Sequence, residues 1–249
     1  MRMKCIVAYD GTNYNGYQIQ PNVMSIQEEI ETVLTKIHGG SRIQIYASGR
    51  TDKGVHAKGQ VFHFDTSLKL PTQAWIKAMN AQLPSDILIL DVTVVADDFH
   101  ARYDAVAKQY SYWIYTAPVL DVFRRNYELH YTYPLDFIKM EEALSYFCGT
   151  YDFTSFCSAR TNQLDCVRTI YRFEMQRELE NRFCFVVSGN GFLYNMVRIM
   201  VGTILDIGRG RFQPNDVLSM LAGCDRTLAG MTAPAHGLYL DFVTYENDK

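Results

Sequence analysis

The hydrophobic positions of the chain follow two periods, which predict helices and strands. After Ser25, which can form a capping box with Glu28, apolar residues recur every three or four positions as far as Ile37. A helix is therefore predicted from Ser25 to Ile37. A second helix is predicted to open at Pro71. Alternating or continuous apolar runs bounded by Gly, Asn, Asp or Pro predict the strands of the same region. These strands span residues 4–9, 42–47, 60–64 and 86–95.

The first 95 residues therefore have the element order β-α-β-β-α-β, the split pattern of a ferredoxin-like unit. A similar order returns after residue 105, with an insertion. Its strands are predicted at 109–116, 167–177, 183–188 and 237–245, and its helices at 137–147, 192–207 and 216–221. We predict an α+β fold of two similar ferredoxin-like halves with antiparallel sheets, residues 1–104 and 105–249, and an active-site cleft between the halves.

Composition and charge fit a globular protein and limit what its surface can bind. Hydrophobic residues make up 48% of the 249 residues and charged residues 20%. The formal net charge of -3 excludes a polycationic surface, so a site for a polyanion has to be a local patch of the 24 Lys and Arg residues. The N-terminus turns polar too early for a signal peptide, and polar residues interrupt the longest apolar stretch. A cytoplasmic protein without a membrane span is expected.

The segment Ser48–Ala57 is unusual for a connection between two strands. It reads Ser-Gly-Arg-Thr-Asp-Lys-Gly-Val-His-Ala and places Asp52 close to two cations, Arg50 and Lys53. Nearby cations lower the pKa of a carboxyl group and keep it ionised, so Asp52 is a candidate nucleophile. Turn chemistry alone offers another interpretation, a type I turn over residues 51–54 in which Asp and Gly serve only the bend.

Two positions in the second half could take part in the same chemistry. Tyr110 lies in a predicted strand beside basic residues, where it either packs in the core or stacks on an exposed base. Arg198 interrupts an apolar helix and needs a partner if it is buried. That partner is either a structural acid or Asp52, unless the guanidinium reaches water.

A metal or a cofactor is not indicated by the motifs of the chain. Neither candidate metal set has the two-His helical spacing of a metalloenzyme. There is no P-loop, no dinucleotide fingerprint and no Gly-x-Ser-x-Gly elbow. A metal-dependent hydrolase nevertheless stays an alternative. The two sets are His56, His63 and Asp65, and Asp97, Asp98 and His100.

Three motifs resemble those of the TruA family of tRNA pseudouridine synthases. Residues 49–57 resemble the family's signature loop, whose Asp, here Asp52, is catalytic. Residues 99–112 are similar to the second motif, in which the Tyr at the place of Tyr110 lies against the target uridine. Residues 192–198 are similar to the third motif, whose Arg, here Arg198, pairs with the catalytic Asp. This chain carries Asn195 where the family often has His, which leaves the role of that side chain open. Weaker matches cover nearly the whole chain.

The resemblance implies an isomerase that converts uridine to pseudouridine at positions 38, 39 and 40 in the anticodon arm of tRNA, without a cofactor and as a homodimer. In this interpretation Asp52 is the nucleophile and Arg198 holds it ionised. Arg50 occupies the space of the flipped base or binds its phosphate, and Tyr110 stacks on the uracil. An RNA-binding protein of the same fold without turnover is the main alternative. Phosphate contacts are expected from Lys53, Lys58, Arg102, Lys108 and Arg168.

Overall fold

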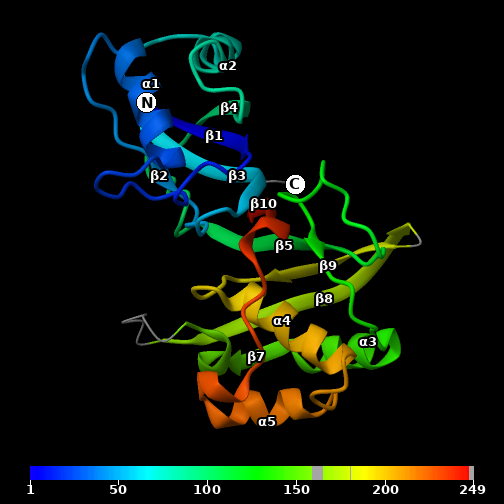
Figure 1. The fold of residues 1–249 in the computed structure, drawn as a ribbon. Helices are drawn as coiled ribbons and strands as arrows, with labels where there is room; N and C mark the ends of the chain where they lie inside the picture. Colours follow the sequence, from blue (N-terminus) through cyan, green and yellow to red (C-terminus); the bar gives the residue numbers. More distant parts are fainter. Residues whose placement is uncertain (159–164, 180, 247–249) are drawn as a thin grey trace. The chain divides into compact units, whose positions relative to one another are not determined.

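The computed structural model describes residues 1–158, 165–179 and 181–246 (Figure 1). The chain forms two compact units. Unit 1 comprises Met1–Val106 and the described residues from Tyr239 onward, and unit 2 comprises Ala107–Leu238. The fold mixes helices and strands in both units, as the sequence predicts at this coarse level. Among the residues that the structure describes, no helix is both long and apolar enough to span a membrane.

Unit 1 is a sheet covered by two helices. Its strands run in the order β4-β1-β3-β10, and β2 also pairs with β3. Figure 1 shows α1 and α2 next to each other beside these strands. The core between helices and sheet includes Trp75, Phe64 and Met3, all without exposed surface. The elements are β1 (Arg2–Tyr9), α1 (Ile26–Ile37), β2 (Tyr46–Ala47), β3 (His56–Asp65), α2 (Thr72–Asn80), β4 (Ile87–Val95) and β10 (Leu238–Tyr245).

Unit 2 is built on strands in the order β5-β9-β8-β7, with β6 pairing to β5. The chain enters this unit within β5, and helix α3 contacts both α4 and α5. The regular elements are β5 (Ala105–Tyr115), β6 (Leu129–His130), α3 (Phe137–Tyr146), β7 (Gly149–Asp152), β8 (Val167–Leu179), β9 (Arg182–Gly189), α4 (Met196–Gly208) and α5 (Asp216–Gly223). Single 3-10 turns lie at Thr154–Phe156, Arg226–Leu228 and Ala235–Gly237.

The strand pairing differs from the predicted all-antiparallel sheets. β10 runs parallel to β3, and β6 runs parallel to β5. β10 also belongs to the first compact unit, although it follows unit 2 in the chain. Parallel pairing requires a long crossover connection, and here unit 2 supplies it for β3 and β10. The division into functional halves at residue 104 stays a prediction.

Two predicted elements are shorter in the structure than in the sequence pattern. Only Tyr46 and Ala47 of the predicted strand 42–47 pair with β3, because a strand exists only where it has a partner. Helix α4 begins at Met196 rather than at 192, because Asn195 has φ 60° and ψ 7°, a left-handed conformation that a helix cannot contain. The predicted N-terminus of α1 is confirmed, since the Ser25 side chain accepts from the backbone N–H of Glu28.

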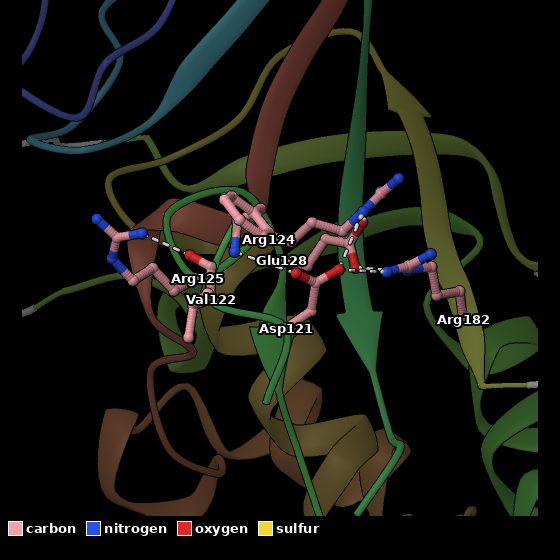
Figure 2. A network of polar contacts seen from close by, with 7 residues as sticks. Asp121, Val122, Arg124, Arg125, Glu128 and Arg182 are labelled. Atoms are coloured by element: carbon pink, nitrogen blue, oxygen red, sulfur yellow. Dashed lines mark hydrogen bonds and ion pairs between the residues drawn. The ribbon is translucent and has the colours of Figure 1, made fainter. Parts of the chain in front are cut away.

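A cluster of charges holds the segment inserted between β5 and α3 (Figure 2). Arg124 and Arg182 both bond to Glu128, at 2.5 and 3.0 Å, and Glu128 is only 5% exposed. Arg182 also reaches Asp121 at 3.2 Å, so it ties the inserted segment to the start of β9. A carboxylate that is buried this deeply needs such partners. The cluster therefore fixes the path of the insertion on unit 2.

Edge strand β4 is protected by a side chain from α2. The Asn80 amide accepts from the Ile89 N–H at 2.8 Å and donates to the Ile89 carbonyl at 2.9 Å. Unpaired backbone groups at a sheet edge are a template for another strand. By occupying both groups of Ile89, Asn80 blocks strand addition at this point of an otherwise apolar edge.

His63 on β3 is expected to make the stability of the protein depend on pH. It is 2% exposed, and its Nδ1 accepts from the Ala101 N–H at 3.1 Å. Burial, aided by the charge of Arg2, lowers the pKa of His63 to about 4. The unfolded chain, with a His pKa of about 6.5, binds more protons between these values, so stability falls as pH falls from about 6.5 to 4. Urea titrations at pH 7 and pH 4.5 should show a loss of about 1 to 3 kcal/mol from this group.

The matched variant for this measurement is His63→Asn, which keeps an acceptor for the Ala101 N–H but does not titrate. Its free energy of unfolding should be lower at pH 7 and should change less between the two pH values. Parallel pH dependences of the wild type and the variant would rule out His63 as the source.

Candidate active site

The signature loop, residues 49–57, follows Ser48 and forms most of the connection from β2 to β3, and it is partly buried. The Val55 N–H donates to the Asp52 carbonyl at 3.1 Å, so the turn covers residues 52–55, one position later than turn chemistry predicts. Gly54 is its third residue and has φ 77°, as a type II turn requires. Asp52 itself is partly exposed while Thr51 is buried. The carboxylate therefore stands on a rigid backbone at the surface of unit 1.

Buried polar side chains fix the base of this loop. The Tyr9 hydroxyl and Thr51 Oγ1 share a hydrogen bond of 2.8 Å, and both residues are buried. Gln60 has no exposed surface; it accepts from the Ser48 hydroxyl at 2.6 Å and donates to the Gly49 carbonyl at 3.0 Å. Buried polar groups make a structure rigid when all of them have hydrogen-bond partners, so these bonds fix the backbone of the loop.

The loop at residues 10–18 packs against the signature loop backbone to backbone. The Tyr17 N–H donates to the Thr51 carbonyl at 3.0 Å. Gly16 has φ 93°, and a Cβ there would lie 2.8 Å from the Thr51 carbonyl oxygen. Only glycine, which has no Cβ, lets the backbone at position 16 come this close to the Thr51 carbonyl. The two loops consequently hold each other in place.

His56 closes the end of the signature loop. Its Nδ1 accepts from the Gly11 N–H at 3.1 Å and lies 3.1 Å from an Asp10 carboxylate oxygen. Its ring stacks on Tyr239 of β10 at a centroid distance of 4.7 Å. The side chain is 2% exposed, so it is placed to support the loop rather than to meet a substrate.

The predicted cationic residues of unit 1 lie on its surface. Arg50 is exposed and its Nε donates to Gln18 Oε1 at 3.1 Å. Lys53 is exposed in the turn. Lys58 pairs with Asp241 at 3.1 Å, which offsets its charge toward a polyanion. Arg102 is exposed, with its guanidinium 5.9 Å from the centre of the Tyr103 ring.

Tyr110 and Arg198 lie in unit 2. Tyr110, in the middle of β5, is 8% exposed and meets the Phe192 ring edge to face at 5.1 Å. Arg198, in the first turn of α4, donates from Nε to the Ala233 carbonyl and from Nη1 to Asn195 Oδ1, both at 2.7 Å. Its guanidinium is thereby held in one orientation within the unit.

The other predicted cations also belong to unit 2. Lys108 is partly buried on β5, where it pairs with Gly189 of β9. Arg168, on β8, donates from Nη1 to the carbonyl of Val167 at 2.6 Å. Unit 1 thus carries Asp52, Arg50, Lys53 and Arg102, and unit 2 carries Tyr110, Arg198, Lys108 and Arg168.

Several residues of the two candidate metal sets make other contacts. Asp65 binds the Arg2 guanidinium with two hydrogen bonds of 2.8 Å. The His63 and His100 rings meet edge to face at 4.8 Å. Within residues 1–158, 165–179 and 181–246, no group of three or more His, Cys, Asp or Glu side chains is arranged to hold a metal ion.

The sequence pattern does not predict the residues that support the signature loop. Gln60 could have been suspected of a supporting role, since it is a polar residue at the start of an apolar predicted strand. Tyr9 could not, because an aromatic residue at the end of a strand is common.

The sequence pattern also does not predict an open hollow of about 310 Å³ in unit 1. Asp52 and Arg50 are not among its described lining residues, which are Ala8, Tyr9, Asp10, Ala57, Lys58, Ser85, Asp86, Leu88 and Tyr239.

Comparison with known proteins identifies the family of the chain. The profile of the family described as tRNA pseudouridine synthase matches residues 5–104 and 143–246. The chain belongs to this family. The tRNA pseudouridine synthase A of Geobacillus kaustophilus is 54% identical over 250 residues, which cover 99% of this chain and 95% of the relative. That of Bacillus subtilis is 49% identical over 248 residues, 99% of this chain and 100% of the relative.

Among solved structures, a Cbf5-Nop10-Gar1 complex aligns with 97% of this chain and 59% of that chain, at 12% identity and a TM-score of 0.38. So distant a likeness adds nothing to the site. Membership of the family, together with the rigid presentation of Asp52, is what directs attention to the signature loop.

Proposed function

We propose that the protein isomerises uridines 38, 39 and 40 in the anticodon arm of tRNA to pseudouridine. As a member of the family it is an isomerase that acts on uridine in tRNA. The choice of positions is supported by the full-length similarity to proteins named tRNA pseudouridine synthase A. The observation that carries the proposed site is the signature loop, whose backbone is fixed on several sides while Asp52 stays accessible.

The reaction breaks the C1′–N1 bond, turns the uracil and forms a C1′–C5 bond, so the hydrogen on C5 is lost to water. It needs no oxidant. The base must first leave its stack, and the detached uracil must be kept in a pocket from which water is excluded. A carboxylate fixed beside the ribose and the ring is the group that can start this exchange.

Asp52 would supply that carboxylate and Arg198 would keep it ionised, because an adjacent guanidinium lowers the pKa of a carboxyl group. Tyr110 would stack on the uracil, and Arg50 would fill the place of the flipped base or bind its phosphate. Lys53, Arg102, Lys108 and Arg168 would contact phosphates, each adding about one to the slope of log K against log salt.

The finer description of the fold and assembly belongs to the same proposal. Two ferredoxin-like halves divided near residue 104 are supported by the order β1-α1-β2-β3-α2-β4 with the neighbours β4-β1-β3-β2 in unit 1. We also propose that the protein works in the cytoplasm as a homodimer. Light scattering of the protein with and without tRNA would show whether the active species is a dimer.

Release of tritium from a tRNA transcript that carries [5-³H]uridine tests the function. The wild-type protein should release tritium from transcripts with uridine at 38, 39 or 40, and not when all three are cytidine. Binding without release would favour the RNA-binding alternative, and release that a chelator abolishes would favour a metal-dependent reaction. Release that persists with cytidine at all three positions would contradict the proposed target sites.

A further inference from the structure

Asn195 stands at the N-cap of α4 in a conformation that few residues adopt. Its φ of 60° is left-handed, a region in which Asn, Asp and His are enriched among non-glycine residues. An Asn at an N-cap ordinarily accepts from a backbone N–H of the first turn. The Asn195 side chain makes no such bond. Its amide bonds to two other side chains instead.

The amide bridges two side chains of unit 2. Asn195 Oδ1 accepts from Arg198 Nη1 at 2.7 Å, and Asn195 Nδ2 donates to Ser158 Oγ at 2.7 Å. The Ser158 N–H in turn donates to the Tyr194 carbonyl at 3.1 Å, which fixes the hydroxyl next to the helix start. Because a guanidinium can only donate, the amide oxygen has to face Arg198 and the nitrogen has to face Ser158. The orientation of the amide is therefore set by chemistry.

Hydrogen bonds hold the Arg198 guanidinium at Nε and at Nη1. Nε is fixed by the Ala233 carbonyl, a backbone group that no side-chain substitution removes. Nη1 donates to the Asn195 side chain, which a substitution can remove. Together, these two bonds at different nitrogens set both the position and the plane of the guanidinium.

We propose that Asn195, locked by Ser158, is the positioning residue for Arg198 in the isomerisation. The inference rests on the proposed function, in which Arg198 keeps Asp52 ionised. Asn195 does not touch the uridine in this account. It sets where the guanidinium charge stands, and a displacement of about 1 Å at such a group can cost about 100-fold in rate.

The decisive variants are Asn195→Gly and Asn195→His. Glycine keeps the left-handed backbone and removes the amide. Neutral histidine tolerates the same backbone and offers one acceptor nitrogen and one N–H donor, the pair that Asn195 presents to Arg198 and Ser158. Cys224→Gly is the matched control, since Cys224 is exposed and also has a positive φ, 47°, at the C-terminal end of α5.

Steady-state tritium release is expected to separate the variants. Asn195→Gly should lower kcat about 10- to 100-fold with KM within about twofold, and should move the acid limb of the kcat/KM profile to higher pH. Asn195→His should restore kcat to within a few-fold at pH 8 and lose it below about pH 6.5, because a protonated imidazole has no acceptor. Cys224→Gly should match the wild type.

A merely structural role for Asn195 would lower the melting temperature without moving the acid limb, and that result would overturn the inference. Equal activity of Asn195→Gly and the wild type would overturn it as well, while leaving the proposed function intact. If the wild type released no tritium, the proposed function would fail separately. The ¹⁵Nε–¹Hε signal of Arg198 would still test the positioning. It should be sharp and exchange slowly in the wild type and in Asn195→His at pH 8, and broaden in Asn195→Gly; an unchanged signal would count against the proposal.

Discussion

Replacing Asp52 with asparagine is expected to lower the rate of tritium release by at least about 10⁴-fold, the scale on which removal of a nucleophile acts. The carboxamide has the shape of the carboxylate but is a far weaker nucleophile. Asn is also a good turn residue, so the turn over residues 52–55 should survive. The free energy of unfolding should therefore change by no more than about 0.5 kcal/mol.

The affinity of Asp52→Asn for tRNA, measured by filter binding, should stay close to that of the wild type or rise slightly, because a negative charge has been removed near the phosphates. Lys53→Gln is the matched neighbour, exposed in the same turn, and should weaken binding while turnover of bound tRNA continues. Turnover by Asp52→Asn within tenfold of the wild type would show that another group is the nucleophile. Unfolding of the variant would favour the turn interpretation instead.

Substituting Gly16 with alanine is expected to cost about 100-fold in turnover at a distance from the reacting atoms. The new Cβ would lie 2.8 Å from the Thr51 carbonyl oxygen. The backbone fixes the position of that Cβ, and the oxygen is itself a backbone atom, so neither can rotate away. The signature loop has to move, and Asp52 moves with it. The unfavourable φ of 93° adds a loss of stability of about 1 to 3 kcal/mol.

Gly40→Ala separates these two effects. Gly40 has nearly the same φ, 96°, but nothing lies within 4 Å of the place its Cβ would take. Thermal unfolding should show a loss of stability from the strained φ in both variants, larger in Gly16→Ala because of its contact with Thr51, whereas only Gly16→Ala should lose turnover. Equal loss of activity in both would mean that general destabilisation, and not displacement of the loop, is responsible.

Local features of the fold were predictable from the sequence because they depend on neighbours in the chain. The helical spacing behind Ser25 and the capping by its hydroxyl are interactions within one turn, and the structure confirms them. The late start of α4 was not predictable from hydrophobicity, since apolar residues continue through 192–194 and only the backbone of Asn195 breaks the helix. The place of β10 depends on pairing with β3, and the paired residues, such as Tyr239 and His56, are 183 positions apart in sequence.

In the candidate site, too, short local motifs were predictable from the sequence and contacts between distant segments were not. Asp52, Tyr110 and Arg198 were chosen from short motifs, and their joint action stays a proposal that mutants must test. The groups that support them were not visible, because the contact of Tyr9 with Thr51 and the bridge from Ser158 to Arg198 each join segments distant in sequence. In the sequence, Asn195 stands out only as a departure from the third family motif, and its bonds to Arg198 and Ser158 give that departure a physical meaning.

The late position of β10 in the chain has a consequence for synthesis on the ribosome. The His56 ring at the end of the signature loop stacks on Tyr239, and β3 gains its parallel neighbour only from β10. Unit 1 therefore has to wait until all of unit 2 has been translated before its sheet is complete. A nascent chain that stalls within unit 2 would lack β10, and the signature loop would then be without the Tyr239 ring that stacks on His56.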